Sequence, residues 1–99
     1  MARGRIYSRY RMIVTALGLK ELDVYRVKGK DGRIVDVLRI MDPGTGKVVL
    51  VDLEAPRESL SLEEFLARLV KKLEDAGMPV SERILERVKS KLLSASTKS

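Results

Sequence analysis

Turn-forming residues divide this chain into short segments, and this division limits the folds that it can adopt. The turn signals stand at Gly18, Asp31-Gly32, residues 42–47, Pro56, and Gly77 with Pro79. Glycine supplies left-handed backbone conformations, and proline stops both helices and strand ladders. Between these signals the apolar residues recur first at helical spacing, then at strand-like spacing, then again at helical spacing. The pattern predicts an α+β fold, and 99 residues suit one domain.

The N-terminal segment, residues 5–19, fits two structures. Its apolar residues follow the helical pattern i, i+1, i+4, i+7, i+8, i+11, at Ile6, Tyr7, Tyr10, Ile13, Val14 and Leu17. The rival interpretation is a strand, because Ile, Tyr, Val and Thr favour strands. The helix matches more positions, so we predict a helix that ends at Gly18. In a helix Tyr7 and Tyr10 would face the core, whereas in a strand Tyr7 could stack on a base.

The middle of the chain is expected to form three strands. Residues 24–28 alternate loosely, and Lys30-Asp31-Gly32 then signals a tight hairpin. Residues 34–41 are apolar on both faces, as in a central strand. A loop at residues 42–47 leads to a third strand at residues 48–53, and Pro56 ends the sheet. Short loops between consecutive strands predict an antiparallel meander.

The C-terminal third is expected to be helical. Ser61 and Glu64 form a capping-box pattern that begins one helix, and Gly77 with Pro79 ends it. Ser81 is the expected N-cap of a second helix. We expect residues 1–93 to form one compact domain and residues 94–99 to form a flexible polar tail.

The expected architecture is a three-stranded antiparallel meander with one face covered by the C-terminal helices. An N-terminal helix (or edge strand) packs at an edge or end of this sheet. The order α-β-β-β-α is similar to that of double-stranded-RNA-binding domains. That family has a lysine-rich turn at the start of the helix after the third strand, whereas residues 61–64 here are acidic. An acidic helix start repels phosphate, so we do not assign the chain to that family.

The positive charge of the chain lies in its N-terminal third. Residues 1–30 contain 8 Lys or Arg and 2 Asp or Glu, whereas residues 31–60 have a net charge of −2 and residues 61–99 of +2. A segregated basic region is typical of a protein that binds a polyanion. The candidate nucleic-acid-binding residues are Arg3, Arg5, Arg9, Arg11, Lys20, Tyr25, Arg26, Lys28, Lys30 and Arg33. Guanidinium groups would grip phosphate, and Tyr25 could stack on a base.

Catalytic, metal and cofactor sites find little support in the sequence. The chain has no Cys and no His, which removes the commonest nucleophile and proton carrier. Residues 44–47 read Gly-Thr-Gly-Lys, but the serine or threonine of a phosphate loop is missing and a strand follows. Asp52 and Glu54 could hold a hard cation, although a solvated strand end explains them better. We expect a protein that is not an enzyme and has no cofactor.

The leading functional hypothesis is a small, backbone-directed nucleic-acid-binding protein with low sequence specificity. RNA and DNA, and single and double strands, remain open. The alternative is a protein–protein adaptor or small subunit of a larger complex, and the C-terminal helices are the candidate surface for a homodimer. Asn, Gln and Cys are absent and 34% of residues are charged, which favours a thermophilic source. No signal peptide or apolar span of membrane length is evident, so we expect a cytoplasmic protein.

Overall fold

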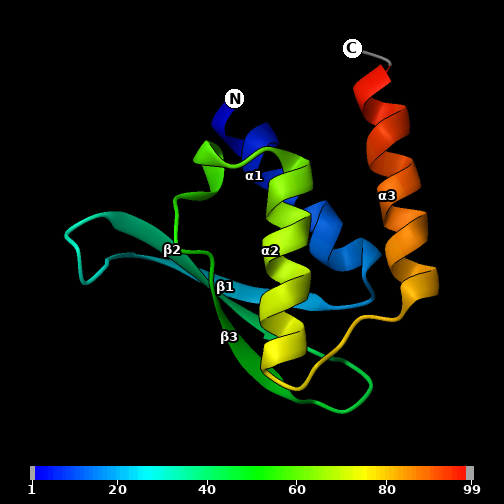
Figure 1. The fold of residues 1–99 in the computed structure, drawn as a ribbon, viewed down its shortest axis with the longest axis horizontal. Helices are drawn as coiled ribbons and strands as arrows, with labels where there is room; N and C mark the ends of the chain where they lie inside the picture. The colour runs from blue at the N-terminus through cyan, green and yellow to red at the C-terminus, as the bar shows by residue number, and fades with distance from the viewer. Residues whose placement is uncertain (1, 98–99) are drawn as a thin grey trace.

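The computed structural model describes residues 2–97, with side chains described for residues 9–92. The elements follow in the order α1 (Ala2–Ala16), β1 (Lys20–Lys28), β2 (Ile34–Met41), β3 (Val48–Asp52), a 3-10 turn η1 (Arg57–Ser59), α2 (Leu62–Asp75) and α3 (Glu82–Thr97). Figure 1 shows α2 crossing the sheet, with α3 beside it and running in the opposite direction. The expected α+β fold, with one N-terminal and two C-terminal helices, is confirmed.

The sheet is an antiparallel meander with the order β1-β2-β3. Residue Lys28 pairs with Ile34, and the register continues to Lys20 opposite Met41, with an irregularity between Glu21 and Asp23. β3 pairs only with residues 37–41 of β2. β2 is therefore the central strand, as its apolar pattern predicts, and its first residues extend past β3.

The core lies on one face of the sheet. Leu38 and Ile40 of β2 and Val51 of β3 are fully buried there, because alternate side chains of a strand share a face. Phe65 and Leu69 of α2 pack into the same cluster, together with apolar residues from α1 and α3. The helices thus cover one face, and the other face carries exposed side chains.

α1 settles the choice between helix and strand in favour of the helix. Tyr10, Ile13, Val14 and Leu17 are buried, as the helical spacing predicts. Tyr10 stacks edge-to-face on Phe65 with ring centroids 4.9 Å apart, and its hydroxyl donates to the Leu60 carbonyl oxygen at 3.1 Å. After the helix, Gly18 adopts φ +82°, a left-handed conformation that suits glycine. The side chains of Ile6 and Tyr7 lie outside the described residues.

The helix signals in the C-terminal third are also found in the structure. The Ser61 hydroxyl accepts from the Glu64 backbone N–H at 3.1 Å, and the Glu64 carboxylate accepts from the Ser61 N–H at 3.0 Å. The Ser81 hydroxyl accepts from the Ile84 N–H at 3.3 Å. α3 continues to Thr97, into the stretch where the sequence predicts a flexible tail. No glycine or proline interrupts residues 82–97, so nothing local ends the helix earlier.

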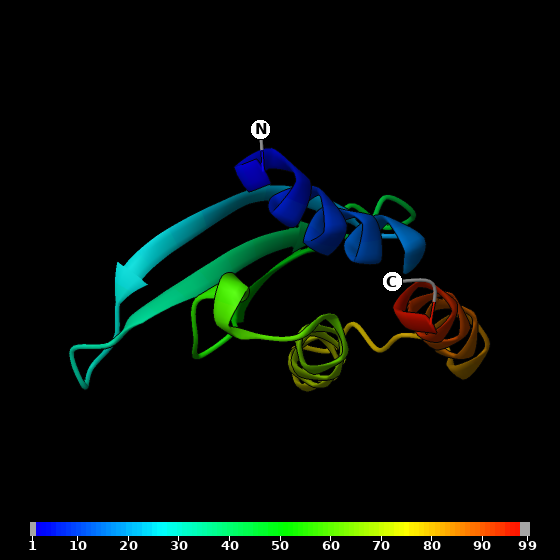
Figure 2. The same cartoon turned by 90° about the horizontal axis from the view of Figure 1, so that it is seen from above.

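The β1–β2 hairpin reaches beyond the helices. Figure 2 shows the two strands curving away from α1 and α2 toward the loop at residues 29–33. Gly32 adopts φ +85° in this loop, which explains the Asp-Gly turn signal. The hairpin is therefore a two-stranded ribbon with solvent on both sides at its tip.

Candidate nucleic-acid interface

The arginines of α1 present part of the predicted basic surface. Arg3 and Arg5 lie within α1, and their side chains are outside the described residues. Arg9 and Arg11 are exposed. Among side chains 9–92, neither takes part in a salt bridge. Their guanidinium groups can therefore meet a phosphate without first breaking an ion pair in that part of the chain.

The lysines lie along β1 and its hairpin. Lys20 begins β1, Lys28 ends it, and Lys30 follows in the turn. All three are exposed, and no salt bridge within residues 9–92 includes them. Lys28 and Lys30 stand at the loop end of β1, and Lys20 stands at the opposite end of the strand, after α1. The loop end of β1 is the projecting tip of the ribbon in Figure 2. The structure thus separates the predicted basic residues into a group on α1 and a group on the ribbon.

Arg26 is turned toward acidic side chains. Its Nε donates to Asp36 Oδ1 at 2.9 Å, its Nη2 donates to Asp36 Oδ2 at 3.1 Å, and Nη2 also bonds to Glu58. The hydrogen bonds from Asp36 and then Glu58 raise the pKa of the guanidinium further above its usual range. The sequence suggests that Arg26 and Lys28 project together, but Arg26 is neutralised by two carboxylates and contributes less to a phosphate surface.

Arg33 is also paired, within its own turn. Its Nε donates to Asp31 Oδ2 at 2.7 Å, and its backbone N–H donates to Asp31 Oδ1 at 3.0 Å. The side-chain hydrogen bond from Arg33 lowers the pKa of the Asp31 carboxyl. Both side chains are exposed, so water and salt screen the pair and a phosphate can compete for the guanidinium.

Tyr25 lies on the sheet face that no helix covers. Its side chain is 46% exposed, and its hydroxyl donates to Asp23 Oδ2 at 3.1 Å. Asp23 also accepts two hydrogen bonds from Arg39, at 3.1 and 2.7 Å. The hydroxyl is therefore held in place while the ring stays accessible, as stacking on a base requires.

The same sheet face carries apolar side chains. Val27, Val48 and Leu50 are exposed there, and Leu50 reaches 64%. Arg39 stands opposite Leu50 in the register, so the face combines aliphatic groups with a paired arginine. An antiparallel sheet can leave one face to water, but exposed apolar side chains on it can also contact a partner.

Asp36 forms an ionic cluster with Arg26 and Arg57 where the β1–β2 ribbon leaves the rest of the sheet. This cluster was not predicted from the sequence. Asp36 is only 1% exposed, and its Oδ2 accepts from the Arg57 backbone N–H at 2.9 Å and from Arg57 Nε at 3.2 Å. Burial raises the pKa of the Asp36 carboxyl, but the hydrogen bonds and charges of Arg26 and Arg57 outweigh burial and lower it overall. Asp36 therefore stays ionised, although it shares a face of β2 with the buried apolar residues Leu38 and Ile40.

A signal for part of this cluster was present in the sequence. A hairpin centred on Asp31 brings residues equally distant from it opposite each other, which pairs Arg26 with Asp36. Opposite charges facing across an antiparallel pair attract. The contribution of Arg57 could not be found in this way, because it depends on the path of the chain after β3.

Glu21 is a partly buried acidic residue of β1. Its Oε1 atom is buried and has no hydrogen-bond partner among them. Burial raises the pKa of this carboxyl, while the positive charges of Arg57 and Arg11 oppose the rise. The Glu21 carboxyl therefore interacts electrostatically with Arg57 of the ionic cluster and with Arg11 of α1.

The remaining sequence candidates take part in local structure. Gly46 adopts φ +75° and the Asp42 N–H donates to the Lys47 carbonyl oxygen at 2.8 Å, so residues 42–47 form a hairpin loop. Asp52 Oδ1 accepts from the Glu54 backbone N–H at 2.8 Å. The Glu54 carboxylate lies 3.4 Å from Lys72 Nζ. Both carboxylates therefore have partners within the chain.

Comparison with known proteins gives no family assignment. No protein-family model, no curated protein and no solved structure matches this chain. Within residues 2–97, no helix is both long enough and apolar enough to cross a membrane.

Proposed function

We propose that this protein binds nucleic acid through the sugar-phosphate backbone and is not an enzyme. The supporting observation is a set of exposed arginines and lysines on α1, β1 and the ribbon. They have no salt bridge among the described side chains: Arg9, Arg11, Lys20, Lys28 and Lys30. Lysine and arginine side chains release counterions when they neutralise phosphates, which drives association at low salt. Arg3, Arg5 and Arg33 add charge to the same region of the sequence.

The proposed binding mode has two contacts joined by β1. Arg9 and Arg11 hold one stretch of backbone, and Lys28 and Lys30 at the ribbon tip hold another. Tyr25 and the apolar side chains around it, on the sheet face that no helix covers, offer a surface for unstacked bases. The chain has no Asn or Gln, the side chains that best read adenine edges, so we propose low sequence specificity.

The test is a binding titration against single- and double-stranded RNA and DNA at several salt concentrations. Replacing Arg9 and Arg11 by alanine should weaken binding and flatten the log–log salt dependence by about two units. The control is the double alanine variant of Arg83 and Arg87, which removes equal charge from the exposed surface of α3. Equal losses in both variants would show a general effect of net charge and would count against a defined interface.

A second candidate function is a small subunit or adaptor of a larger complex. The observation that favours it is the uncovered sheet face, on which Val27, Val48 and Leu50 are exposed. Such side chains are common at protein interfaces. A flat response to all four nucleic acids in the titration would favour this second function over the first.

We also propose a source organism and a cellular location, from the composition of the chain and from its proposed partner. The absence of Asn, Gln and Cys and the abundance of charged residues favour a thermophilic organism. A nucleic-acid partner favours the cytoplasm. A midpoint of thermal unfolding above about 90 °C would support the thermophilic origin.

A further inference from the structure

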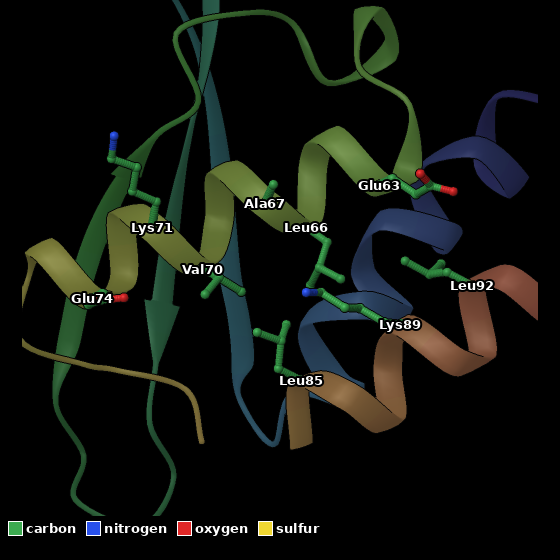
Figure 3. A pocket seen from close by; sticks show the side chains of 9 residues that line it. All are labelled: Glu63, Leu66, Ala67, Val70, Lys71, Glu74, Leu85, Lys89 and Leu92. Carbon is green, nitrogen blue, oxygen red and sulfur yellow. The ribbon is translucent and has the colours of Figure 1, made fainter. Parts of the chain in front are cut away.

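A groove lies between α2 and α3, on the side of the molecule away from the ribbon. It encloses about 400 Å³. Its walls are apolar and come from both helices: Leu66, Ala67, Val70, Leu85 and Leu92. Figure 3 shows Val70 and Leu85 facing each other across it, with Leu92 farther along α3. The two helices therefore leave between them an apolar channel of the kind that accepts another helix.

Among the side chains at residues 9–92, those of α3 are less buried than those of α1 and α2. Val88 is its only buried side chain among residues 82–92, whereas Ile84, Leu85 and Leu92 are partly exposed. Leu85 and Leu92 are seven residues apart, about 10.5 Å along the helix axis. They form an apolar row that α1 and α2 cover only in part.

The charges around the groove are balanced, unlike those of the whole chain. Glu63 and Glu74 lie on the α2 side with Lys71, and Lys89 extends from α3 toward α2 (Figure 3). The whole chain has a net charge of +6. Two copies therefore repel each other at long range over most of their surface, but the groove offers each copy as many acids as bases. In a two-fold interface the same patch of both copies meets itself, so the patch needs both positive and negative charges.

We propose that this groove is the interface of a homodimer, in which α3 of each copy lies against the α2–α3 groove of the other. A two-fold axis then brings the row of Leu85 and Leu92 onto Leu66 and Val70 of the second copy. Each Lys89 faces a helix α2 that carries Glu63 and Glu74. The four helices form a bundle in which α3 takes the central position and α2 the flanking one.

The proposed dimer does not depend on the proposed nucleic-acid function. Arg9, Arg11, Lys28 and Lys30 do not line the groove, so the two proposals rest on different residues. The two associations should also differ in their response to salt. Salt weakens binding to a phosphate backbone, whereas it screens the repulsion between two positively charged copies. Failure of one proposal can therefore be distinguished from failure of the other.

Ala67→Arg is the primary test. Ala67 is exposed and lines the groove, and arginine suits a helix, so the variant should fold and fill the channel with a charged side chain. The matched control is Ser90→Arg, at an exposed position of α3 that does not line the groove. In sedimentation over a dilution series we expect dimers for the parent and the control, and monomers for Ala67→Arg. Circular dichroism checks that all three proteins fold.

A charge exchange gives the second test. Lys89→Glu alone, and Glu63→Lys with Glu74→Lys in one chain, should each lose the dimer, because like charges then face each other. An equal mixture of the two proteins should regain it as a heterodimer. A parent that is monomeric at every concentration, an Ala67→Arg variant as dimeric as the parent, or a mixture that stays monomeric would overturn the proposal.

Discussion

Asp36 Oδ2 accepts hydrogen bonds from both the backbone N–H and Nε of Arg57, at 2.9 and 3.2 Å, although the two residues are 21 positions apart. A buried carboxylate in the central strand thus fixes the segment that leads from the sheet to α2. The same carboxylate binds Arg26 at the base of the ribbon. The ionised Asp36 side chain therefore connects the turn η1, which leads to α2, with the projecting β1–β2 ribbon.

Asp36→Asn should lower the free energy of unfolding by about 3–5 kcal/mol, because the buried Arg57 would lose the negative charge of Asp36. Arg57 is only 6% exposed, so water cannot replace the lost partner. Chemical denaturation measures the loss. Asp75→Asn, at an exposed position near the end of α2, is the control and should change stability little. Similar values for both variants would contradict a structural role for the buried carboxylate.

Acid should destabilise the protein through the same residue. The pKa of Asp36 is lower in the folded chain than its ordinary value of 3.8, so the folded state binds its proton less readily than the unfolded state does. The contribution to stability is complete above the ordinary pKa and is lost as pH falls through the folded value. Unfolding free energies measured across the acid range should decline less steeply in Asp36→Asn than in the parent. Parallel curves would contradict this assignment.

Glu21 should have the opposite effect on the pH dependence. Burial raises its pKa above the ordinary value of 4.5, so ionisation is less favourable in the folded than in the unfolded chain. Its contribution therefore destabilises the protein increasingly as pH rises from the ordinary pKa through the folded one. Glu21→Gln should be more stable than the parent near neutral pH, and the gain should vanish at pH values below 4.5. Glu86→Gln, at an exposed position, should show no such trend.

Tyr10→Phe should cost about 1 kcal/mol, the typical contribution of one buried hydrogen bond. The lost bond runs from the Tyr10 hydroxyl to the Leu60 carbonyl oxygen, whereas the ring contact with Phe65 is retained. Tyr10→Ala removes the ring as well and should cost about 3–5 kcal/mol. Thermal denaturation distinguishes the two variants. A loss in Tyr10→Phe as large as in Tyr10→Ala would show that the hydroxyl has a greater role than this geometry supports.

Much of the fold could be predicted because its signals are local. The left-handed glycines, the Ser61–Glu64 capping box and the apolar residues of α1 each act within a few positions, and all are found in the structure. The end of α3 could not be placed, since Ser94, Ala95 and Ser96 neither stop a helix nor require one.

The candidate site could be predicted only in part. The positions of exposed basic residues such as Arg9 and Lys28 follow from helix and strand periodicity. The state of Arg26 does not, because its second carboxylate, Glu58, lies 32 positions away and arrives through the turn η1. Charge counts along a sequence include such paired residues, so they overstate the charge that a surface offers to a ligand.

The meander also has a consequence for how the chain is made. Each strand pairs only with its neighbour in sequence, so the sheet can assemble as soon as residue 52 has emerged during synthesis. The face that carries Leu38, Ile40 and Val51 then has only α1 to cover it until Phe65, Leu69 and Leu73 of α2 follow. A nascent chain of this protein thus passes through a stage at which α1 alone covers its finished sheet, and that stage ends only when the α2 sequence leaves the ribosome.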